Sequence, residues 1–532
     1  MTNPAAMKTS IALLPFLFAL VLSPRLCLAQ AFTRGQVLFQ SDFESPATLA
    51  AWHPAPTLAD GFNSKQSLLV QLPPNSSQPS AIVLATLPVE NMRGCTLYCS
   101  AMIRAQAVTD KPKPWHGIKF MVPIDAPSGK SWPQAALDTG SFDWKHLSFA
   151  VRIPSDATAV SLCLGLEAVT GKVWFDDIKI TIAKAPAIPR TRPTTGPVYK
   201  GHSLPRLRGT MINPAITPDS LRVLGQQWNA NLLRWQLIRF ARPGQTISPA
   251  DYDKWLDSEL ARLDAAIPLC QQYGIHVVID LHSPPGGKPT VSGYVGSDDR
   301  LFTDKSCQDH FVNVWRKIAT RYKDTKIIWA YDLANEPVED VIPDDCDDWQ
   351  ALAQHAALAI RAIDPLRTII VEPADWGGPQ GLRDFYPIHV PNVVYSVHMY
   401  LPMEFTHQGV FGNSAPVRYP GPINGQHWDK ARIEAALKPV IDFQKSYNVH
   451  IYIGEFSAIR WAPDNSAHRY LTDVIDIFES HNWDWTYHAF REWQGWSVEH
   501  GQDRADTKPT TPPTDRQKLL QAWFAQNQKK TP

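Results

Sequence analysis

The sequence predicts two domains, an all-β sandwich followed by a (β/α)8 barrel, within a chain of 532 residues. Three observations support this fold class. Residues 183–198 are rich in proline and can form neither a helix nor a central strand, so we expect them to be a linker. Before this segment, short runs alternate between apolar and polar residues, as in antiparallel sheets. After it, short apolar runs alternate with longer patterns of helical period, as in α/β folds.

The composition of the chain excludes several classes of protein. Its 51 basic and 51 acidic side chains balance to a net charge of zero, so the chain lacks the basic surface that nucleic-acid binding requires. With 44% hydrophobic residues the chain is not disordered as a whole, and seven cysteines are too few for a disulfide scaffold. The 19 tryptophans offer flat faces of the kind on which sugar rings stack.

Residues 1–31 are expected to be a secretory signal peptide. Lys8 precedes an apolar run over residues 11–22, which is too short to span the roughly 30 Å of a membrane's hydrocarbon core. Ala29 and Ala31 supply the small residues that signal peptidase reads. We therefore expect cleavage near Ala31, a secreted or periplasmic mature protein, and no membrane insertion after cleavage.

Residues 32–182 form the predicted sandwich domain. Their alternating runs are broken by Pro, Gly, Asn and Asp, which is typical of antiparallel strands joined by turns. Helical patterns are almost absent from this segment. The clearest strand patterns are Ser67–Leu72, Thr96–Arg104, Lys145–Arg152 and Ser161–Leu166.

The two ends of this domain resemble a known module. Ser41–Glu44 and Val173–Ile178 are similar to the terminal strands of jelly-roll carbohydrate-binding modules. The resemblance implies that Glu44 and Asp177 hold a structural calcium ion, which prefers oxygen ligands. Two roles stay open for such a sandwich, since it either binds sugar or serves as a spacer. The candidates for sugar stacking are Trp115, Trp132 and Trp144.

Residues 199–527 form the predicted barrel domain, in which eight apolar runs are separated by amphipathic stretches. Thr217-Pro218 and Ser248-Pro249 are typical helix starts, because a capping hydroxyl precedes a proline at the first helical position. Further helical patterns cover residues 307–322, 349–363, 429–447, 467–480 and 516–524. The apolar runs are Leu207–Asn213, Asn231–Ile238, His276–His282, Lys326–Pro337, Thr368–Ala374, Val393–Tyr400, His450–Ser457 and Trp485–Glu492.

Six cysteines remain after the predicted cleavage. Cys307 and Cys346 each precede or begin a helical pattern. In an oxidising compartment they could form one disulfide, and the sequence does not decide whether they do. The cysteine spacing fits no zinc pattern, and the sequence has no His-Glu-x-x-His. We therefore expect no cofactor for catalysis.

Polar side chains stand at the ends of the predicted barrel strands. In a parallel barrel these ends meet at one face, where barrel enzymes place their active sites. Two of them are glutamates, Glu336 at the end of the fourth run and Glu455 near the end of the seventh. A pair of carboxylates that flank a glycosidic bond is the minimum machinery for its hydrolysis. The other polar strand ends are Asn213, Arg234, His282, Asn335, His398 and Tyr400.

Three motifs at these positions resemble one family. Asn335-Glu336-Pro337, Gly454-Glu455-Phe456 and Tyr395-Ser-Val-His398-Met-Tyr400 are similar to signatures of glycoside hydrolase family 5, the retaining barrel enzymes that include cellulases and mannanases. The resemblance covers the barrel only, from about Tyr199 to Gln526. It implies that Glu336 is the general acid/base, that Glu455 is the nucleophile, and that Asn335 binds the sugar 2-hydroxyl. Retention predicts carboxyl groups about 5 to 5.5 Å apart.

The resemblance also implies supporting roles. Arg234 is expected to lie beneath Glu455 and to favour its ionised form, because a nearby cation lowers a carboxyl pKa. His398 and Tyr400 are expected to orient the two carboxylates, and His282 to line the subsite at the cleavage point. These surroundings should separate the pKa values of the two glutamates.

The eighth run departs from the family pattern. The family places a tryptophan at its end, whereas this chain has His488 there. Either Trp493 or Trp496 replaces that ring as the floor of the cleavage subsite, or a different ring does. Trp376, after the fifth run, is a further candidate for stacking. The loop over residues 401–427, rich in Gly, Pro and Asn, is expected to shape specificity.

Together these features predict an exported, retaining β-glycoside hydrolase whose substrate is a β-linked polysaccharide or oligosaccharide of gluco or manno configuration. The sugar chain is the expected partner, and nucleic acid is not. Two alternatives stay open, an exo-acting β-glycosidase or β-galactosidase of the same barrel group, and a carbohydrate-binding protein without activity. An aldolase or phosphate-using barrel fits less well, because no Gly-rich phosphate site follows the last strands and no lysine ends a strand.

Overall fold

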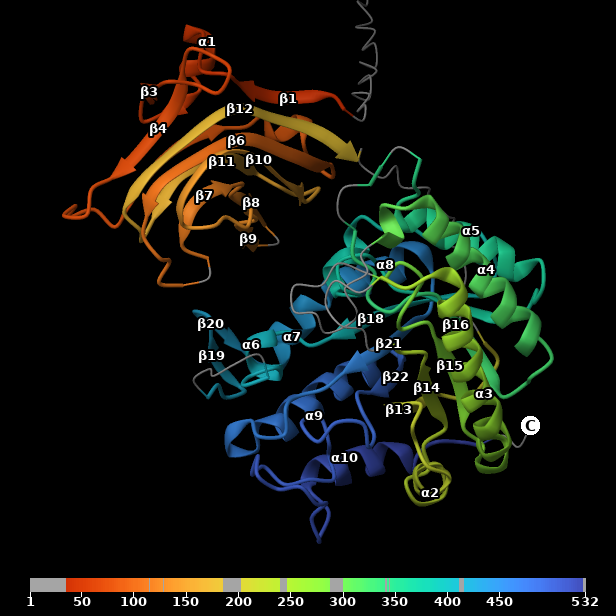
Figure 1. The fold of residues 1–532 in the computed structure, drawn as a ribbon. Coiled ribbons are helices and arrows are strands. Elements are labelled where there is room, and N and C mark those ends of the chain that lie inside the picture. The colour runs from red at the N-terminus through yellow and green to blue at the C-terminus, as the bar shows by residue number, and fades with distance from the viewer. Residues whose placement is uncertain are drawn as a thin grey trace, which may run out of the picture.

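The computed structural model shows two bodies, a β-sandwich and a barrel with a shell of helices (Figure 1). The predicted signal peptide and residues 185–198 of the predicted linker lie outside the described residues. The structure describes residues 35–113, 115–127, 129–184, 202–239, 246–287, 300–339, 342–343, 345–410 and 416–529.

Two six-stranded antiparallel sheets build the front domain, residues 35–184. The strands are β1 (Val37–Ser41), β2 (Trp52–His53), β3 (Thr57–Ala59), β4 (Ser67–Leu72), β5 (Ser80–Thr86), β6 (Thr96–Val108), β7 (Gly117–Met121), β8 (Ile124–Ala126), β9 (Gly129–Ser131), β10 (Gly140–Arg152), β11 (Ala159–Glu167) and β12 (Gly171–Lys184). One sheet has the order β10-β6-β12-β4-β3 with β1 against β12, and the other has β2-β5-β11-β8-β9 with β7 against β11. Side chains from both sheets, such as Ile103 and Leu164, share one buried core. The predicted all-β sandwich is confirmed.

Eight parallel strands close the barrel of the second domain. They are β13 (Arg208–Ile212), β14 (Leu232–Gln236), β15 (His276–Asp280), β16 (Ile328–Asp332), β17 (Thr368–Val371), β18 (Val393–Met399), β21 (Ile451–Phe456) and β22 (Asp484–Tyr487). Every residue of these strands is buried, as expected for parallel strands that are covered on both faces. Each strand overlaps one predicted run, so the (β/α)8 prediction is confirmed.

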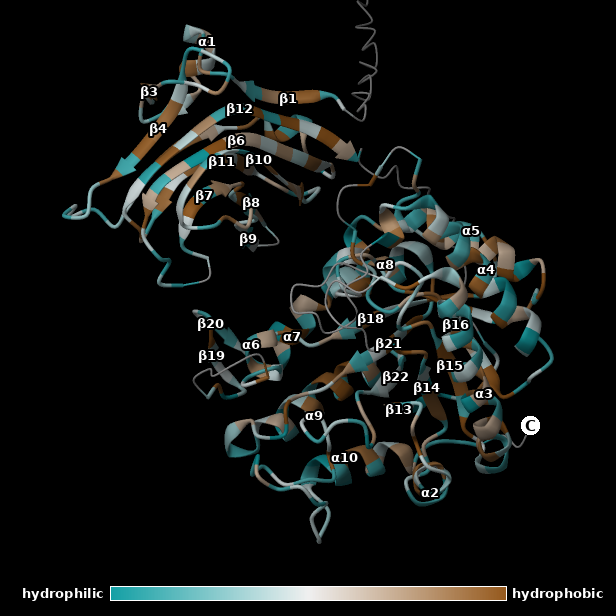
Figure 2. Cartoon of the chain, in the orientation of Figure 1, coloured by the Kyte–Doolittle hydropathy of each residue, from teal (hydrophilic) through white to brown (hydrophobic). Residues whose placement is uncertain are grey.

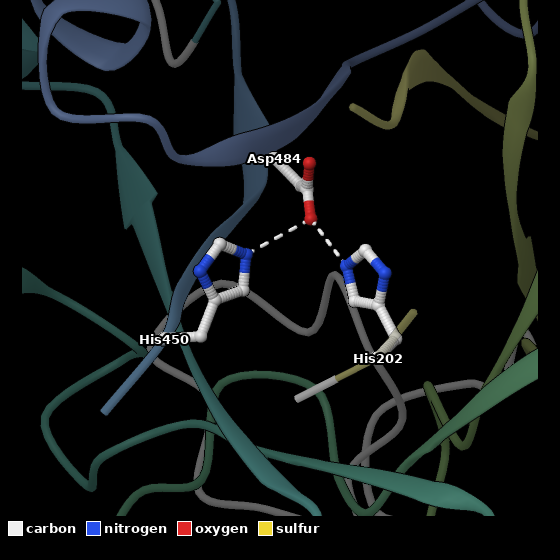
Figure 3. Close-up of side chains that lie close together, drawn as sticks. All are labelled: His202, His450 and Asp484. Atoms are coloured by element: carbon white, nitrogen blue, oxygen red, sulfur yellow. Dashed lines mark hydrogen bonds and ion pairs between the residues drawn. The ribbon is translucent and has the colours of Figure 1, made fainter. Parts of the chain in front are cut away.

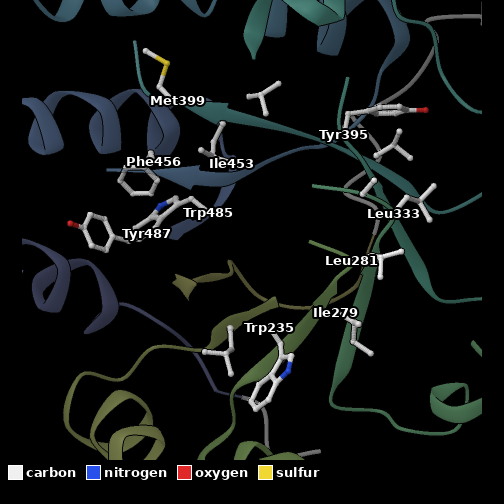
Figure 4. Close-up of a cluster of buried hydrophobic side chains, with 14 of the residues drawn as sticks. Trp235, Ile279, Leu281, Leu333, Tyr395, Met399, Ile453, Phe456, Trp485 and Tyr487 are labelled. Carbon is white, nitrogen blue, oxygen red and sulfur yellow. The ribbon is translucent and has the colours of Figure 1, made fainter. Parts of the chain in front are cut away.

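The barrel has an inner and an outer core. Leu232, Val278 and Ile370 belong to a small inner cluster that takes residues from successive strands. The neighbouring strand residues point outward and pack against the helices, as Trp235 and Phe456 do in Figure 4. The covering helices carry both hydrophobic and hydrophilic residues, as amphipathic helices require (Figure 2).

The helices of the barrel begin where the sequence predicts them. The Thr217 hydroxyl accepts the backbone N–H of Ser220, and the Ser248 hydroxyl accepts that of Asp251, so both predicted caps form. The elements of the shell are α2 (Pro218–Arg222), η2 (Val223–Gln227), α3 (Pro249–Tyr273), α4 (Lys305–Tyr322), α5 (Trp349–Arg361), η4 (Pro379–Arg383), α6 (Met403–Thr406), α7 (Lys430–Ala436), α8 (Lys438–Tyr447), α9 (Ser466–Ser480) and α10 (Asp515–Phe524), with the small strands β19 (Gly421–Ile423) and β20 (Gln426–Trp428).

Several predicted boundaries were wrong. The predicted helix over residues 429–447 is two helices, α7 and α8, because Pro439 has no N–H to continue the hydrogen-bond ladder. The fourth strand ends at Asp332, well before Glu336, whose φ of 45° is foreign to a strand. The eighth strand ends at Tyr487, so His488 lies in the turn beyond it.

Two further expectations bear on compartment. Among the described residues, no helix combines the length and apolarity needed to cross a membrane. Cys346 is a free thiol, so the disulfide with Cys307 that the sequence left open is not formed.

Ion pairs join the front domain to the barrel domain. Arg152 at the end of β10 pairs with Asp384, 2.8 Å away, and Arg383 lies 3.5 Å from Asp156. Lys184, the last residue of β12, pairs with Glu339 at 3.2 Å and with Asp348 at 3.1 Å. Burial acts to lower the pKa of Lys184, but the two carboxylates outweigh it and raise that pKa. Ion pairs between specific side chains therefore contribute to the contact between the two domains.

Figure 3 shows a buried His-Asp-His cluster. Because Asp484 begins β22 and His450 precedes β21, the cluster stands at the opposite end of the barrel from the two glutamates. Oδ2 of Asp484, the first residue of β22, lies 2.7 Å from Nε2 of His202 and 2.9 Å from Nε2 of His450. Its Oδ1 accepts the backbone N–H of Leu207 at 2.8 Å. Burial acts to raise the pKa of Asp484, but the hydrogen bonds from the two histidines hold it well below its usual range. The cluster ties the segment before β13 to β21 and β22.

His276, at the start of β15, predicts a loss of stability in acid. Burial, aided by the charge of His202, lowers its pKa to about 4 from an ordinary 6.5. Because the unfolded chain binds this proton more readily, stability is expected to fall as the pH drops from 6.5 towards 4. Between pH 7.5 and 4.5 the native chain should lose about 2 to 3 kcal/mol more than a His276→Gln variant. Urea unfolding of both proteins at the two pH values measures this, and equal losses would contradict it.

Candidate active site

The carboxyl ends of the barrel strands bring the predicted polar residues together. Arg234 lies on β14, His398 on β18 and Glu455 on β21, while Glu336 follows β16. All four converge because parallel strands end at the same face of a barrel. Asn213, after β13, does not join them: its side chain accepts the backbone N–H of Ala215 and closes a local turn.

Glu455 lies in a strongly cationic pocket. Nη1 of Arg234 donates to its Oε1 at 2.6 Å, and the Tyr400 hydroxyl donates to its Oε2 at 2.8 Å. Nδ1 of His488 is 3.3 Å from the same Oε2. Burial acts to raise the pKa of Glu455, but the charges of His398, His488 and Arg234 outweigh it and hold that pKa well below its usual range. Glu455 is therefore a carboxylate at neutral pH.

Glu336 is the more accessible of the two glutamates, with 21% of its side chain exposed against 5% for Glu455. Nδ1 of His398 donates to its Oε1 at 2.9 Å. Burial acts to lower the pKa of His398, but Glu372 and Glu455 outweigh it and raise that pKa well above the ordinary value. A carboxyl oxygen of Glu336 lies within 4.8 Å of one of Glu455.

Arg234 is shared by four buried carboxylates. Its guanidinium lies 3.1 Å from Asp280, 3.0 Å from Asp332, 3.0 Å from Glu372 and 2.6 Å from Glu455. Burial raises the pKa of Asp332 well above its ordinary value; Arg234 opposes this rise, and Glu372 adds to it. Four acidic side chains thus share one guanidinium, and Glu455 makes the shortest of these contacts.

Asn335 and His282 are fixed by the same network. Nη2 of Arg234 donates to Oδ1 of Asn335 at 3.1 Å, which sets the orientation of the amide. Nδ2 of Asn335 then lies 3.3 Å from Nε2 of His282, whose Nδ1 bonds Asp280 at 2.8 Å. His282 thus carries its proton on Nδ1 and accepts on Nε2.

Glu372 is a site residue that sequence reasoning missed. It follows β17 directly, is fully buried, and accepts the backbone N–H of Glu336 on Oε2 at 2.8 Å. Its Oε1 is 3.0 Å from Nε2 of His398 as an ion pair. A Cβ on Gly377 would lie 2.6 Å from its Oε2, so only glycine fits that close approach. The signal in the sequence was a carboxylate inside an otherwise apolar run.

Glu372→Gln is therefore expected to lower kcat roughly 10- to 100-fold with little change in KM, since it displaces Glu336 and His398 without touching substrate. The loss of its charge should also lower the pKa of His398 and shift the pH profile of kcat, which a purely structural residue would not do. Rates across pH and circular dichroism of the folded variant check this. Glu434→Gln, an exposed position on α7 with 53% side-chain exposure, is the control. An unshifted profile would count against the positioning role.

A second missed group surrounds His488 at the end of β22. The Tyr400 hydroxyl donates to Glu455, so it accepts from Nδ1 of His488 at 2.5 Å. Nε2 of His488 is buried without a hydrogen bond, 3.6 Å from Glu492. Nε2 of Gln236 donates to the same Glu492 at 2.8 Å. Charged and amide groups thus stand where the family pattern led us to expect an indole.

The aromatic candidates separate into two kinds. Trp496 is only 5% exposed and packs against His407, Tyr400 and His488, so it offers little face to a sugar. Trp493 is 42% exposed and Trp376 is 39% exposed, and both rings are available for stacking.

Two groups of three among the described residues have ligand atoms close enough to hold a metal ion. One is the cluster of Figure 3, and the other is Glu336, His398 and Glu455, whose atoms lie within 4.8 Å of one another. In the second group the guanidinium beside Glu455 repels a cation, which favours proton chemistry there. The predicted calcium ligands belong to neither group. Glu44 instead accepts the backbone N–H groups of Lys65 and Gln66 at 2.8 and 2.6 Å.

Comparison with known proteins shows the family of the chain. A family model described as cellulase (glycosyl hydrolase family 5) matches residues 194–493, more than half of the chain. Endoglucanase C of Acetivibrio thermocellus is 27% identical over 254 residues, which cover 43% of this chain and 72% of that protein. Cellodextrinase A of Ruminococcus flavefaciens is 27% identical over 229 residues, covering 41% and 64%. The endoglucanase Cel5A structure of Thermotoga maritima is 24% identical, covers 59% of this chain and 96% of that chain, and has a TM-score of 0.45.

The matched region contains both glutamates and all eight barrel strands. The chain therefore belongs to the cellulase family, glycosyl hydrolase family 5, and is a glycosidase that hydrolyses β-linked O-glycosyl compounds.

Proposed function

We propose that the protein is a retaining enzyme that cleaves β-linked glucan or mannan chains by double displacement. The observation that carries this proposal is the short gap between Glu336 and Glu455, whose nearest carboxyl oxygens lie within 4.8 Å. Retaining enzymes keep their carboxyl groups about 5 to 5.5 Å apart, whereas inverting enzymes need about 6.5 to 9.5 Å to admit a water molecule.

In the first step Glu336 donates a proton to the glycosidic oxygen while an Oε of Glu455 attacks the anomeric carbon. The C–O bond to the leaving sugar breaks and an ester to Glu455 forms. In the second step Glu336 takes a proton from water, and the resulting hydroxide displaces Glu455. Two inversions restore the β configuration. The low pKa of Glu455 suits both attack and departure.

The substrate class rests on the family and on the relatives' names. Those names include endoglucanase, cellodextrinase and β-xylosidase, so they span polymers and short chains. The exposed rings of Trp376 and Trp493 support stacking of a sugar chain. An exo-acting β-glycosidase or a β-galactosidase of the same group stays as the alternative.

The test is a hydrolysis panel with purified protein against soluble cellulose derivatives, mixed-linkage glucan, mannan, xylan and aryl β-glycosides. We expect the protein to cleave a polymer with retention of the β anomer. NMR of the first product identifies that anomer. Turnover of aryl monosaccharides alone would replace the proposal with the exo-acting alternative. An α anomer as first product would overturn retention.

We also propose export and a calcium ion in the front domain. N-terminal sequencing of the exported protein should find the residue after Ala31.

The calcium proposal rests on carboxylates that lie close together at the junction of β1 and β12. Burial raises the pKa of Asp177, and the nearby charges of Asp176 and Asp42 add to the rise. Calcium is expected to raise the melting temperature of native protein but not of an Asp177→Asn variant, and equal melting temperatures would remove the ion from the proposal.

A further inference from the structure

A cavity of about 590 Å³ lies between the front domain and the barrel domain. On the front-domain side it is lined by strand β9 and by the end of β10, including Lys130, Ser131 and Arg152. On the barrel side it is lined by the loops after β16 and β17, including Glu339, Trp376 and Gln380. Its size is within the range of about 300 to 1,000 Å³ that is usual for ligand sites.

The barrel-side wall of the cavity adjoins the catalytic centre, since a Cβ built on Gly377, the residue after Trp376, would lie 3.6 Å from Cγ of Glu336. Val338 and Glu339 in its wall follow Glu336 by two and three residues along the chain. The backbone N–H of Trp376 lies 3.4 Å from the carbonyl of Pro337, and the next residue, Gly377, accepts the backbone N–H of His398 at 2.8 Å. The turn that supports Glu372 and His398 therefore also places the Trp376 ring at the cavity.

The lining has the chemistry of a sugar site. The Trp376 ring is 39% exposed and gives a flat face on which a pyranose can stack. Gln380, Ser131 and Lys130 line the same cavity and carry amide, hydroxyl and charged groups. A β-linked glycan offers hydroxyls at its rim and C–H groups on its faces, which match these two kinds of group.

We propose that this cavity is a distal subsite that binds the continuation of the glycan chain beyond the cleavage point, with the front domain as one wall. This rests on the proposed function, because the chain must first enter the site of Glu336 and Glu455. The pairs Arg152–Asp384 and Lys184–Glu339 hold the wall in place. The front domain is then part of the substrate cleft and not a spacer.

The test fills the cavity from the front-domain side. Lys130, with 63% of its side chain exposed, is replaced in a Lys130→Trp variant, and Ser131→Trp is a second, independent block. The matched control is Lys172→Trp, since Lys172 is exposed near the start of β12, at the opposite end of that strand from Lys184. All variants are made in the full chain and are checked by circular dichroism.

The measured quantities are kcat and KM for cellohexaose and for 4-nitrophenyl β-cellobioside, or for the manno equivalents if the panel selects mannan. We expect Lys130→Trp and Ser131→Trp to raise KM for the hexasaccharide at least about fivefold, the loss of about 1 kcal/mol of binding, and to leave the aryl substrate within about twofold. Lys172→Trp should change neither. Unchanged hexasaccharide kinetics in both blocking variants, or equal losses on both substrates, would overturn the distal subsite.

Failure of the proposed function has a different signature. If the proposed function is wrong, neither the native protein nor any variant turns over any glycan. In that case, calorimetric titration of cellohexaose and mannohexaose into native protein and into the Lys130→Trp variant tests the distal subsite without relying on turnover. Weaker binding to the variant supports the subsite, and equal binding or no binding to either protein overturns it.

Discussion

Glu455→Gln is expected to lower kcat roughly 10⁴-fold or more on every substrate, since the amide can neither ionise nor form the glycosyl ester. The native carboxylate is held by Arg234 at 2.6 Å and by Tyr400 at 2.8 Å. Glutamine keeps the shape of the side chain, so the fold and the binding of substrate should change little. The effect is thus expected in kcat and not in KM.

The measurement is single-turnover kinetics with an aryl β-glycoside, together with mass spectrometry of protein quenched during turnover. Native protein should carry one glycosyl unit on the peptide that contains Glu455, and the variant should carry none. Glu434→Gln on the outer face of α7 serves as the control and should keep native rates. A glycosyl adduct in the Glu455→Gln protein would assign the nucleophile to another residue.

The loss of activity in Glu336→Gln is expected to depend on the leaving group of the substrate. On polymer the loss should be roughly 10²- to 10⁴-fold, the usual contribution of general acid–base catalysis. Dinitrophenyl glycosides need no proton on the departing oxygen, so formation of the glycosyl ester should be nearly native with them. The second step still lacks its base, and the ester should accumulate as a burst.

Azide provides the diagnostic for this variant, because it attacks the ester without needing a base. Added azide is expected to restore turnover of the dinitrophenyl substrate and to give a β-glycosyl azide, which chromatography detects. The alkaline limb of kcat/KM should also vanish, since it reports the proton on the general acid. A variant that azide leaves unchanged, or that gives an α-glycosyl azide, would contradict the role of Glu336.

The strand-end residues could be predicted because all strands of a parallel barrel end at the same face, so residues at the ends of successive apolar runs meet there. Arg234, His398 and Glu455 each stand in or directly after an apolar run, and the topology then fixes their meeting place. Glu372 could not be placed in the same way. The run from Thr368 to Ala374 looked like one continuous strand, whereas β17 ends at Val371 and releases Glu372 into the site.

Contacts between domains could not be predicted at all. Arg152 and Asp384 are far apart in sequence and neither stands in a distinctive local pattern, so only the folded structure pairs them. His488 is an intermediate case. Its departure from the family pattern was visible in the sequence, but its bond to Tyr400 and its contact with Glu455 depend on the turn beyond β22.

The sharing of Arg234 links chemistry to folding. Its carboxylate partners come from β15, from the loop after β17, and from β16 and β21, which are distant along the chain. Glu455 on β21 meets Arg234 on β14 only within the closed barrel, so its low pKa depends on the complete ring of strands. An unfinished chain with an open ring would have a nucleophile of ordinary acidity and no activity. Closure of the barrel is thus the step that completes the nucleophile.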